Sequence, residues 1–291
     1  MNTERLKNLN YRNKKARALV LAVLAFSFIG CTNSQTDQES INEQADSVLQ
    51  EVKLAKAESA ATKVIEKNGL RLLALAEESP FPNASLKMIS PKGKVNSGKQ
   101  TFQFEVEDFD LAEPTEGDRS SLLANSAKGQ HIHFILNNGP YQAQYENEFE
   151  AELSQGHNVI LAFLSRSYHE SVKSEEAFVF TDIQIGEDYA PFDHTAPHLI
   201  YSRPKGSYKL SESNRILIDF YLLNAELSAK GMKVELSIDE TIFLLDSWQP
   251  YWVEGLDAGE HQFRLRLIDD KGNLVFGPFN DSGVRVVKIE E

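Results

Sequence analysis

The chain has 291 residues, of which 25% are charged and 41% hydrophobic, and it carries a formal net charge of −13 at pH 7. An acidic surface repels the phosphates of nucleic acids and of anionic lipids, so this charge argues against nucleic-acid binding and against docking on anionic membranes. The chain has one cysteine, Cys31, which excludes an internal disulfide framework.

The first 30 residues have the pattern of a processing segment rather than that of a folded domain. Six basic residues occur within residues 5–17, and residues 18–28 then form an apolar run. This run has the length of a signal-peptide core and is too short to span a bilayer as a helix. We therefore expect residues 1–30 to be a signal peptide.

The apolar run ends in Phe28-Ile29-Gly30-Cys31, which resembles the lipobox of bacterial lipoproteins, although Phe28 replaces the usual leucine. The resemblance implies cleavage before Cys31 and lipid on that cysteine, which would anchor the protein stably on an envelope membrane. An ordinary signal peptide with a chance cysteine is the alternative. Cleavage would remove a net charge of +5 and leave −18 on the mature chain.

Thr32 follows the cysteine, at the position where an aspartate would retain a lipoprotein at the inner membrane. The resemblance therefore implies a protein of the cell envelope, on the outer membrane, either periplasmic or surface-exposed, rather than on the inner membrane.

Residues 31–68 are expected to form a polar tether and a helical stalk. Residues 40–67 are rich in Ala, Glu, Lys and Gln, and their apolar residues recur at three- and four-residue steps. Asn68-Gly69 would end the helix, because glycine tolerates the left-handed conformation that follows a helix. A solvated spacer helix is the first interpretation, and a helix that packs on the first domain or self-associates is the alternative.

The rest of the chain contains three short segments that occur twice in the same order. This repeat indicates two copies of one domain, at residues 69–190 and 195–291, with about eleven extra residues in the polar segment 113–125 of the first copy. The segments are Ser-Pro-Lys-Gly at 90–93 and Arg-Pro-Lys-Gly at 203–206, Ser-Ala-Lys-Gly at 126–129 and 228–231, and Leu-Ser-Gln-Gly at 153–156 and Leu-Asp-Ala-Gly at 256–259.

Each copy has the sequence pattern of an all-β domain. Apolar and polar residues alternate at 100–106 and 132–136 in the first copy and at 234–238 and 263–267 in the second, and turn-forming residues separate these runs. Short strands at this spacing, in copies of this length, predict two tandem immunoglobulin-like β-sandwiches.

The second half of each copy resembles the closing hairpin of bacterial immunoglobulin-like domains, most clearly at residues 256–272. The whole arrangement is similar to a family of predicted bacterial lipoproteins that carry the label "phosphopeptide-binding protein". The sequence contains neither a glycine-rich loop before a helix nor an arginine cluster, which are the usual means of binding phosphate.

The two copies differ on the outer face of two strands. His131 and His133 alternate with inward-facing apolar residues, and the second copy has Lys233 and Glu235 at their positions. Another strand of the first copy has apolar residues on its outer face, whereas the corresponding strand of the second copy has polar residues there. We expect a partner, the other domain or the stalk to cover this contact face. Its apolar members are Ile135, Val159, Leu161 and Phe163.

Histidines gather on the same predicted face, which permits two interpretations. His131, His133, His157 and His169 could bind copper or zinc, since imidazole suits both metals and a His-x-His strand points both rings the same way. Alternatively, they are ordinary members of a contact surface.

The sequence shows no catalytic constellation. It predicts a non-enzymatic, lipid-anchored binding or adhesion protein that contacts a protein or surface ligand, with a metal-binding envelope protein as the alternative.

Overall fold

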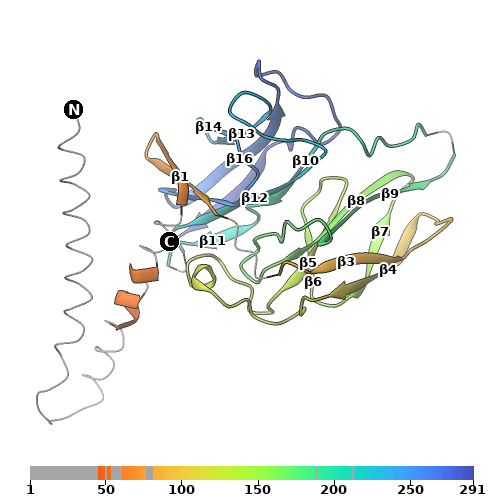
Figure 1. The fold of residues 1–291 in the computed structure, drawn as a ribbon, viewed down its shortest axis with the longest axis horizontal. Coiled ribbons are helices and arrows are strands. Elements are labelled where there is room, and N and C mark those ends of the chain that lie inside the picture. Colours follow the sequence, from red (N-terminus) through yellow and green to blue (C-terminus); the bar gives the residue numbers. More distant parts are fainter. Residues whose placement is uncertain (1–44, 50, 54–60, 77–80, 188, 212) are drawn as a thin grey trace, which may run out of the picture. The chain divides into compact units, whose positions relative to one another are not determined.

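The computed structural model describes residues 45–49, 51–53, 61–76, 81–187, 189–211 and 213–291 (Figure 1). The chain divides into two compact units, residues 1–49 and 50–291. The predicted signal peptide and Cys31 lie outside the described residues. Residues 45–49 and 51–53 are helical, as predicted for the stalk. No helix in the described ranges is long and apolar enough to cross a membrane.

The stalk prediction is wrong at its C-terminal end, because residues 61–67 form a strand. Strands β1 (Ala61–Lys67) and β2 (Leu70–Leu75) pair as an antiparallel hairpin. The turn is Asn68-Gly69, with φ of 51° and 83°. Two consecutive residues with positive φ are typical of a two-residue hairpin turn, for which Asn-Gly is the preferred sequence. The dipeptide expected to end a helix therefore joins two strands.

The first copy is a sandwich of two antiparallel sheets, with strand orders β3-β4-β7 and β6-β5-β8-β9. Phe102, Phe104 and Phe134 are fully buried between the sheets. The bounds are β3 Ser85–Ser90, β4 Gly98–Glu107, β5 His131–Leu136, β6 Gln142–Gln144, β7 Glu148–Leu153, β8 Gly156–Ser165 and β9 Phe178–Ile185, and a 3-10 helix spans Asp118–Ser121.

The second copy repeats this arrangement with additions at the sheet edges. Its sheets have the orders β1-β2-β15-β12-β10 and β11-β17-β16-β13-β14. With β1, β2 and β11 set aside, the strands of each copy can be numbered from one to seven in chain order. In both copies, strands one, two and five then form one sheet, and the other sheet has the spatial order four, three, six, seven. The fold class is thus all-β, with two immunoglobulin-like sandwiches. The bounds are β10 His198–Arg203, β11 Ser207–Lys209, β12 Ile216–Leu223, β13 Lys233–Ile238, β14 Thr241–Leu245, β15 Tyr251–Glu254, β16 Gly259–Ile268 and β17 Arg285–Glu290.

The boundary expected at residue 69 is also displaced, because the β1–β2 hairpin belongs to the second sandwich. β2 pairs antiparallel with β15, with Leu73 opposite Trp252. Leu70 and Leu72 lie in the core of the second sandwich. The second sandwich is therefore built from two strands that precede the first sandwich in the sequence, β1 and β2, and from the strands that follow it.

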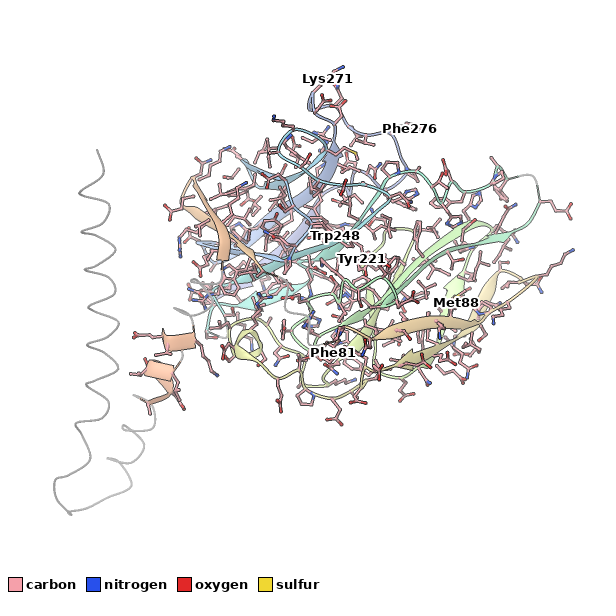
Figure 2. All side chains as sticks on the ribbon, viewed as in Figure 1. Phe81, Met88, Tyr221, Trp248, Lys271 and Phe276 are labelled. Carbon is pink, nitrogen blue, oxygen red and sulfur yellow. The ribbon has the colours of Figure 1, made fainter. Side chains whose placement is uncertain are left out.

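The apolar contact face of the first sandwich is buried against the second sandwich. Ile135, Leu161 and Phe163 form one cluster with residues of β10 and β12, among them Tyr221, whose ring lies 4.8 Å from that of Phe163. Tyr221 in turn contacts Trp248 (Figure 2). Val159 is also buried. The face needs a cover, as expected, and the other domain provides it. These four residues are therefore not open to an external ligand.

The extra segment of the first copy contributes to the same contact. Leu122 and Leu123, which follow the 3-10 helix, pack with Leu73 and Trp252 of the second sandwich. The hydroxyl of Ser213 donates a hydrogen bond of 2.8 Å to the carbonyl of Leu122. The segment that we expected to be a polar loop thus buries two leucines between the sandwiches.

Candidate metal centre

Three of the four candidate histidines meet at the edge of this contact. His131 and His133 lie two residues apart on β5, so their side chains leave the strand on the same side. The Nε2 atoms of His131 and His133 are 3.0 Å apart, and His131 Nε2 is 3.1 Å from His169 Nδ1. The three ligand atoms all lie within 4.8 Å of one another. Both strand histidines are fully buried.

Hydrogen bonds on the far side of two rings orient their inward nitrogens. His131 Nδ1 lies 2.8 Å from the carbonyl oxygen of Gly129, which can only accept, so Nδ1 carries the proton and Nε2 of the neutral ring has a free lone pair. His133 Nδ1 lies 3.2 Å from the hydroxyl of Ser202 on β10. A hydroxyl can accept or donate, so Ser202 can support the tautomer of His133 that leaves Nε2 free for a metal.

A tight turn after β8 brings in His169. Its φ is 68°, a left-handed value that few residues other than glycine adopt. The amide of His169 donates to the carbonyl of Arg166 at 2.8 Å, and the amide of Arg166 donates to the carbonyl of Glu170 at 2.9 Å. A non-glycine residue keeps this conformation where its surroundings determine it, and such positions concentrate at functional sites.

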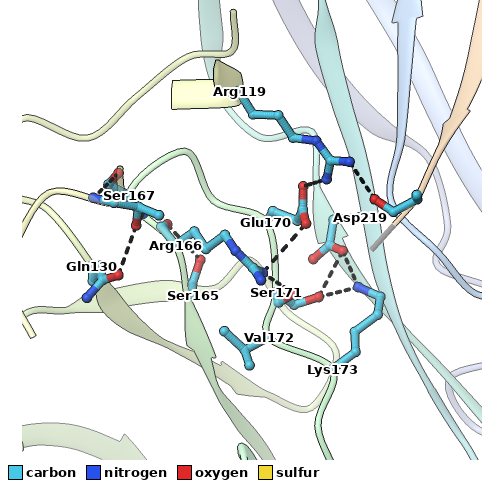
Figure 3. Close-up of polar contacts among 12 residues, drawn as sticks. Arg119, Gln130, Ser165, Arg166, Ser167, Glu170, Ser171, Val172, Lys173 and Asp219 are labelled. Carbon is cyan, nitrogen blue, oxygen red and sulfur yellow. Dashed lines mark hydrogen bonds and ion pairs between the residues drawn. The ribbon is translucent and has the colours of Figure 1, made fainter. Parts of the chain in front are cut away.

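A buried ionic network holds the turn (Figure 3). Glu170 is fully buried and forms ion pairs with Arg119 at 2.7 Å and Arg166 at 3.5 Å. Arg119 also donates to the carbonyl of Ala76. Burial raises the pKa of Glu170 against the opposing effect of the two arginine charges. Glu170, which is next to His169 in the chain, is therefore linked to Arg119 in the extra segment. Through Arg119 it is also linked to Ala76, which follows β2.

The same turn is linked to the second sandwich. The Ser171 hydroxyl donates to Asp219 of β12 at 2.9 Å, and Lys173 Nζ lies 2.7 Å from the same carboxylate oxygen (Figure 3). The position of His169 therefore depends on the docking of the two sandwiches.

The three rings are neutral at pH 7, which is the form that binds metals. Burial lowers the pKa of His131 to about 4 and the pKa of His133 well below its usual value. Burial, followed by the charge of Arg203, lowers the pKa of His169.

The surroundings of the histidines are cationic. Tyr141 stacks on His133 with ring centroids 3.7 Å apart, and Lys205 Nζ lies 4.3 Å from the centre of the Tyr141 ring. Arg203 is buried and donates to the Tyr208 hydroxyl at 2.6 Å.

His157, the fourth candidate ligand, lies elsewhere, so its inclusion in the cluster is wrong. Antiparallel pairing sets His131 opposite Ser165 at the end of β8, whereas His157 lies near the start of that strand. Eight residues of strand separate the two positions by roughly 26 Å. His157 Nδ1 bonds Asp182 at 2.6 Å, and this hydrogen bond raises the pKa of His157.

Sequence reasoning missed the residues that surround the three histidines, namely Tyr141, Ser202, Arg203 and Lys205. The comparison of the copies contains a signal for Ser202 alone. This serine of the second copy stands at the position that Ile89 occupies in the first copy. A polar residue in a strand that is buried on both faces requires a polar partner, and here that partner is His133.

No protein-family model matches the sequence, and no curated protein matches it. Among solved structures, the fibronectin(III)-like modules of Clostridium thermocellum CbhA are similar to this chain at 12% sequence identity. The match covers 70% of this chain and 93% of that chain, with a TM-score of 0.23. A likeness at this level carries no functional information.

Proposed function

We propose that this protein is a lipid-anchored, non-enzymatic protein of the cell envelope that binds one copper or zinc ion through His131, His133 and His169. The observation that supports the proposal most directly is the convergence of three neutral imidazole nitrogens within 4.8 Å. Two of these rings have hydrogen-bond partners on their outer nitrogens, which is the usual arrangement of metal-binding histidines.

An adhesion role with a protein or surface ligand was the first expectation from the sequence. Ile135, Leu161 and Phe163 are buried between the sandwiches, so an external partner would need a different surface. The histidine cluster, and not this buried face, supports metal binding as the first candidate function. The all-β fold is compatible with both functions.

Metal binding is tested by removing ligands one at a time. His169→Asn is the informative variant, since asparagine tolerates the left-handed conformation and His169 is not fully buried. We expect at least about a 100-fold loss of copper or zinc affinity, because even loss of an outer hydrogen-bond partner of a ligand costs roughly 10–100-fold. Titration calorimetry measures the affinity, and the metal-induced rise in Tm of the wild type should disappear in the variant.

The double variant His131→Ala with His133→Ala should bind no metal, while His261→Ala, on β16 of the second sandwich, should bind as the wild type does. Equal, weak and non-saturating heats for the wild type and the double variant would contradict the proposed function.

The lipid anchor is tested independently of the metal. The lipobox-like segment before Cys31 supports the proposal that this cysteine carries lipid, and Thr32 in place of an aspartate supports a position on the outer membrane. Wild type grown with a labelled fatty acid should take up the label and partition into detergent. Cys31→Ser should remain unlabelled, because it lacks the thiol that carries the lipid. An unlabelled wild type would contradict the anchor.

A further inference from the structure

We propose that the three-histidine site selects monovalent copper over divalent zinc. The inference rests on the proposed metal function and adds to it the identity and charge of the ion. The geometry of the three nitrogens and the charge of their surroundings are two separate observations that support it.

The nitrogen atoms are arranged with His131 in the middle. Its Nε2 is 3.0 Å from His133 Nε2 and 3.1 Å from His169 Nδ1. The His133 and His169 rings are farther apart, with centroids at 5.7 Å compared with 4.9 Å for the other two pairs. At metal–nitrogen distances of about 2.0–2.1 Å, neighbouring ligands at these separations subtend about 95°, whereas tetrahedral zinc requires nitrogens about 3.3–3.4 Å apart.

Two near-right angles at one ion are narrower than the tetrahedral angle of about 109°. Zinc in protein sites is almost always tetrahedral, so this set of ligands fits it poorly. Monovalent copper accepts three ligands in a planar or T-shaped arrangement, and imidazole is a suitable ligand for copper. The geometry therefore favours copper.

The charge of the site then favours copper in its monovalent state over a divalent ion. Within the described ranges, His131, His133 and His169 are the one group of histidine, cysteine or acidic side chains placed to share an ion, and it contains neither a carboxylate nor a thiolate. A divalent ion bound by three neutral rings keeps its full charge in a buried place, and the electrostatic cost of burying an ion rises with the square of its charge. A monovalent ion thus carries a much smaller penalty.

Neighbouring cations increase this difference. Arg203 is buried, and its guanidinium carbon lies 5.2 Å from the centre of the Tyr141 ring, which itself stacks on His133. Lys205 Nζ lies 4.3 Å from the same ring centre. Both side chains repel a bound cation, and they repel a divalent ion about twice as strongly as a monovalent one.

The enclosure of the site limits what else could neutralise a divalent ion. His131 and His133 are fully buried, Tyr141 covers one face of His133, and the Tyr145 ring lies 5.0 Å from that of His131. His169 is partly exposed, so it is the least enclosed of the three ligands. Tetrahedral zinc would need a fourth ligand from the side of His169, whereas three-coordinate monovalent copper would not.

The test is a pair of competition titrations on the detergent-solubilised full-length chain. One uses Cu(I) under anaerobic, reducing conditions against bicinchoninate, and the other uses Zn(II) against a chromophoric zinc chelator. We expect one Cu(I) per chain, bound at least about 100-fold more tightly than Zn(II). X-ray absorption should show three nitrogen neighbours and the edge feature of three-coordinate Cu(I).

A charge reversal provides a variant that spares the ligands. Lys205→Glu changes an exposed side chain and should reduce the Cu(I)-to-Zn(II) affinity ratio by at least about tenfold, because it turns a repulsion into an attraction that acts more strongly on the divalent ion. Lys271→Glu, an equal charge change at an exposed position of the turn after β16, should leave the ratio unchanged.

The outcomes separate this inference from the proposed function. Zinc affinity within tenfold of Cu(I) affinity, or an unchanged ratio in Lys205→Glu, would overturn the selectivity and leave the metal function standing. Failure of both ions to bind at one per chain would overturn both.

Discussion

Deletion of residues 61–76, which contain the β1–β2 hairpin, is expected to unfold the second sandwich. Leu70 and Leu72 lie in its core, and Leu73 and Leu75 pack between the sandwiches. Burial of a leucine side chain contributes about 1.5–3 kcal/mol, so four of them contribute roughly 6–12 kcal/mol. This is comparable to the whole stability of a typical protein, about 5–15 kcal/mol.

The deletion would also expose the edge of β15, which pairs with β2 over four residues. A bare strand edge promotes pairing with other chains, so aggregation should accompany the loss of stability. Urea unfolding followed by circular dichroism compares a chain that begins at residue 77 with one that begins at residue 61. The longer chain retains both sandwiches in full and serves as the control. Equal unfolding midpoints for the two chains would show that the hairpin contributes nothing.

The sequence predicted the two sandwiches because their evidence is local. A strand with one buried face alternates polar and apolar residues, and repeated turn segments mark the copies. The hairpin was not predicted, because Ala61–Lys67 has the Ala, Glu and Lys content of a helix and shares its sheet with Tyr251–Glu254, which begins 190 residues later (251 − 61) in the chain. Tertiary pairing overrides local propensity in such segments.

The metal centre was predictable only in part, because only part of its evidence is local. His131 and His133 share a side because they are two residues apart on a strand, which the sequence reveals directly. His157 was placed incorrectly because the sequence does not give the register between β5 and β8, and antiparallel pairing puts it at the far end. Ser202 belongs to the other sandwich, so its contact with His133 depends on domain docking.

The need for a cover over the apolar face was also predictable, whereas the identity of that cover was not. Leu161 and Phe163 are apolar where the second copy has arginines, and an apolar outer face indicates a contact. The matching apolar surface is distributed over β10 and β12. β12 is buried along its whole length and is apolar except for Asp219. Such a run indicates burial on both faces but does not identify the neighbouring element.

Replacement of Glu170 by alanine is expected to destabilise the protein and weaken metal binding together. Glu170 is fully buried between Arg119 and Arg166, so its loss removes a buried counter-charge that both guanidinium groups contact. Removal of one partner from a buried ion pair costs about 3–5 kcal/mol. Urea unfolding measures this loss, and Glu175→Ala, at an exposed position five residues further on, should change stability by no more than about 0.5 kcal/mol.

The effect on metal binding follows from the position of Glu170 next to His169. The backbone of Glu170 accepts from the Arg166 amide and closes the turn that holds His169 at positive φ, while its carboxylate fixes the turn to Arg119. Without that carboxylate, His169 should spend less time at the site, and metal affinity should fall by roughly 10–100-fold, as it does when the outer partner of a ligand is lost. Glu170→Gln keeps the shape and part of the hydrogen bonding, so it should fall between the wild type and Glu170→Ala in both measurements. If Glu170→Ala lowers stability but binds metal as tightly as the wild type at temperatures where it is folded, the ionic network supports the fold alone, and another contact positions His169.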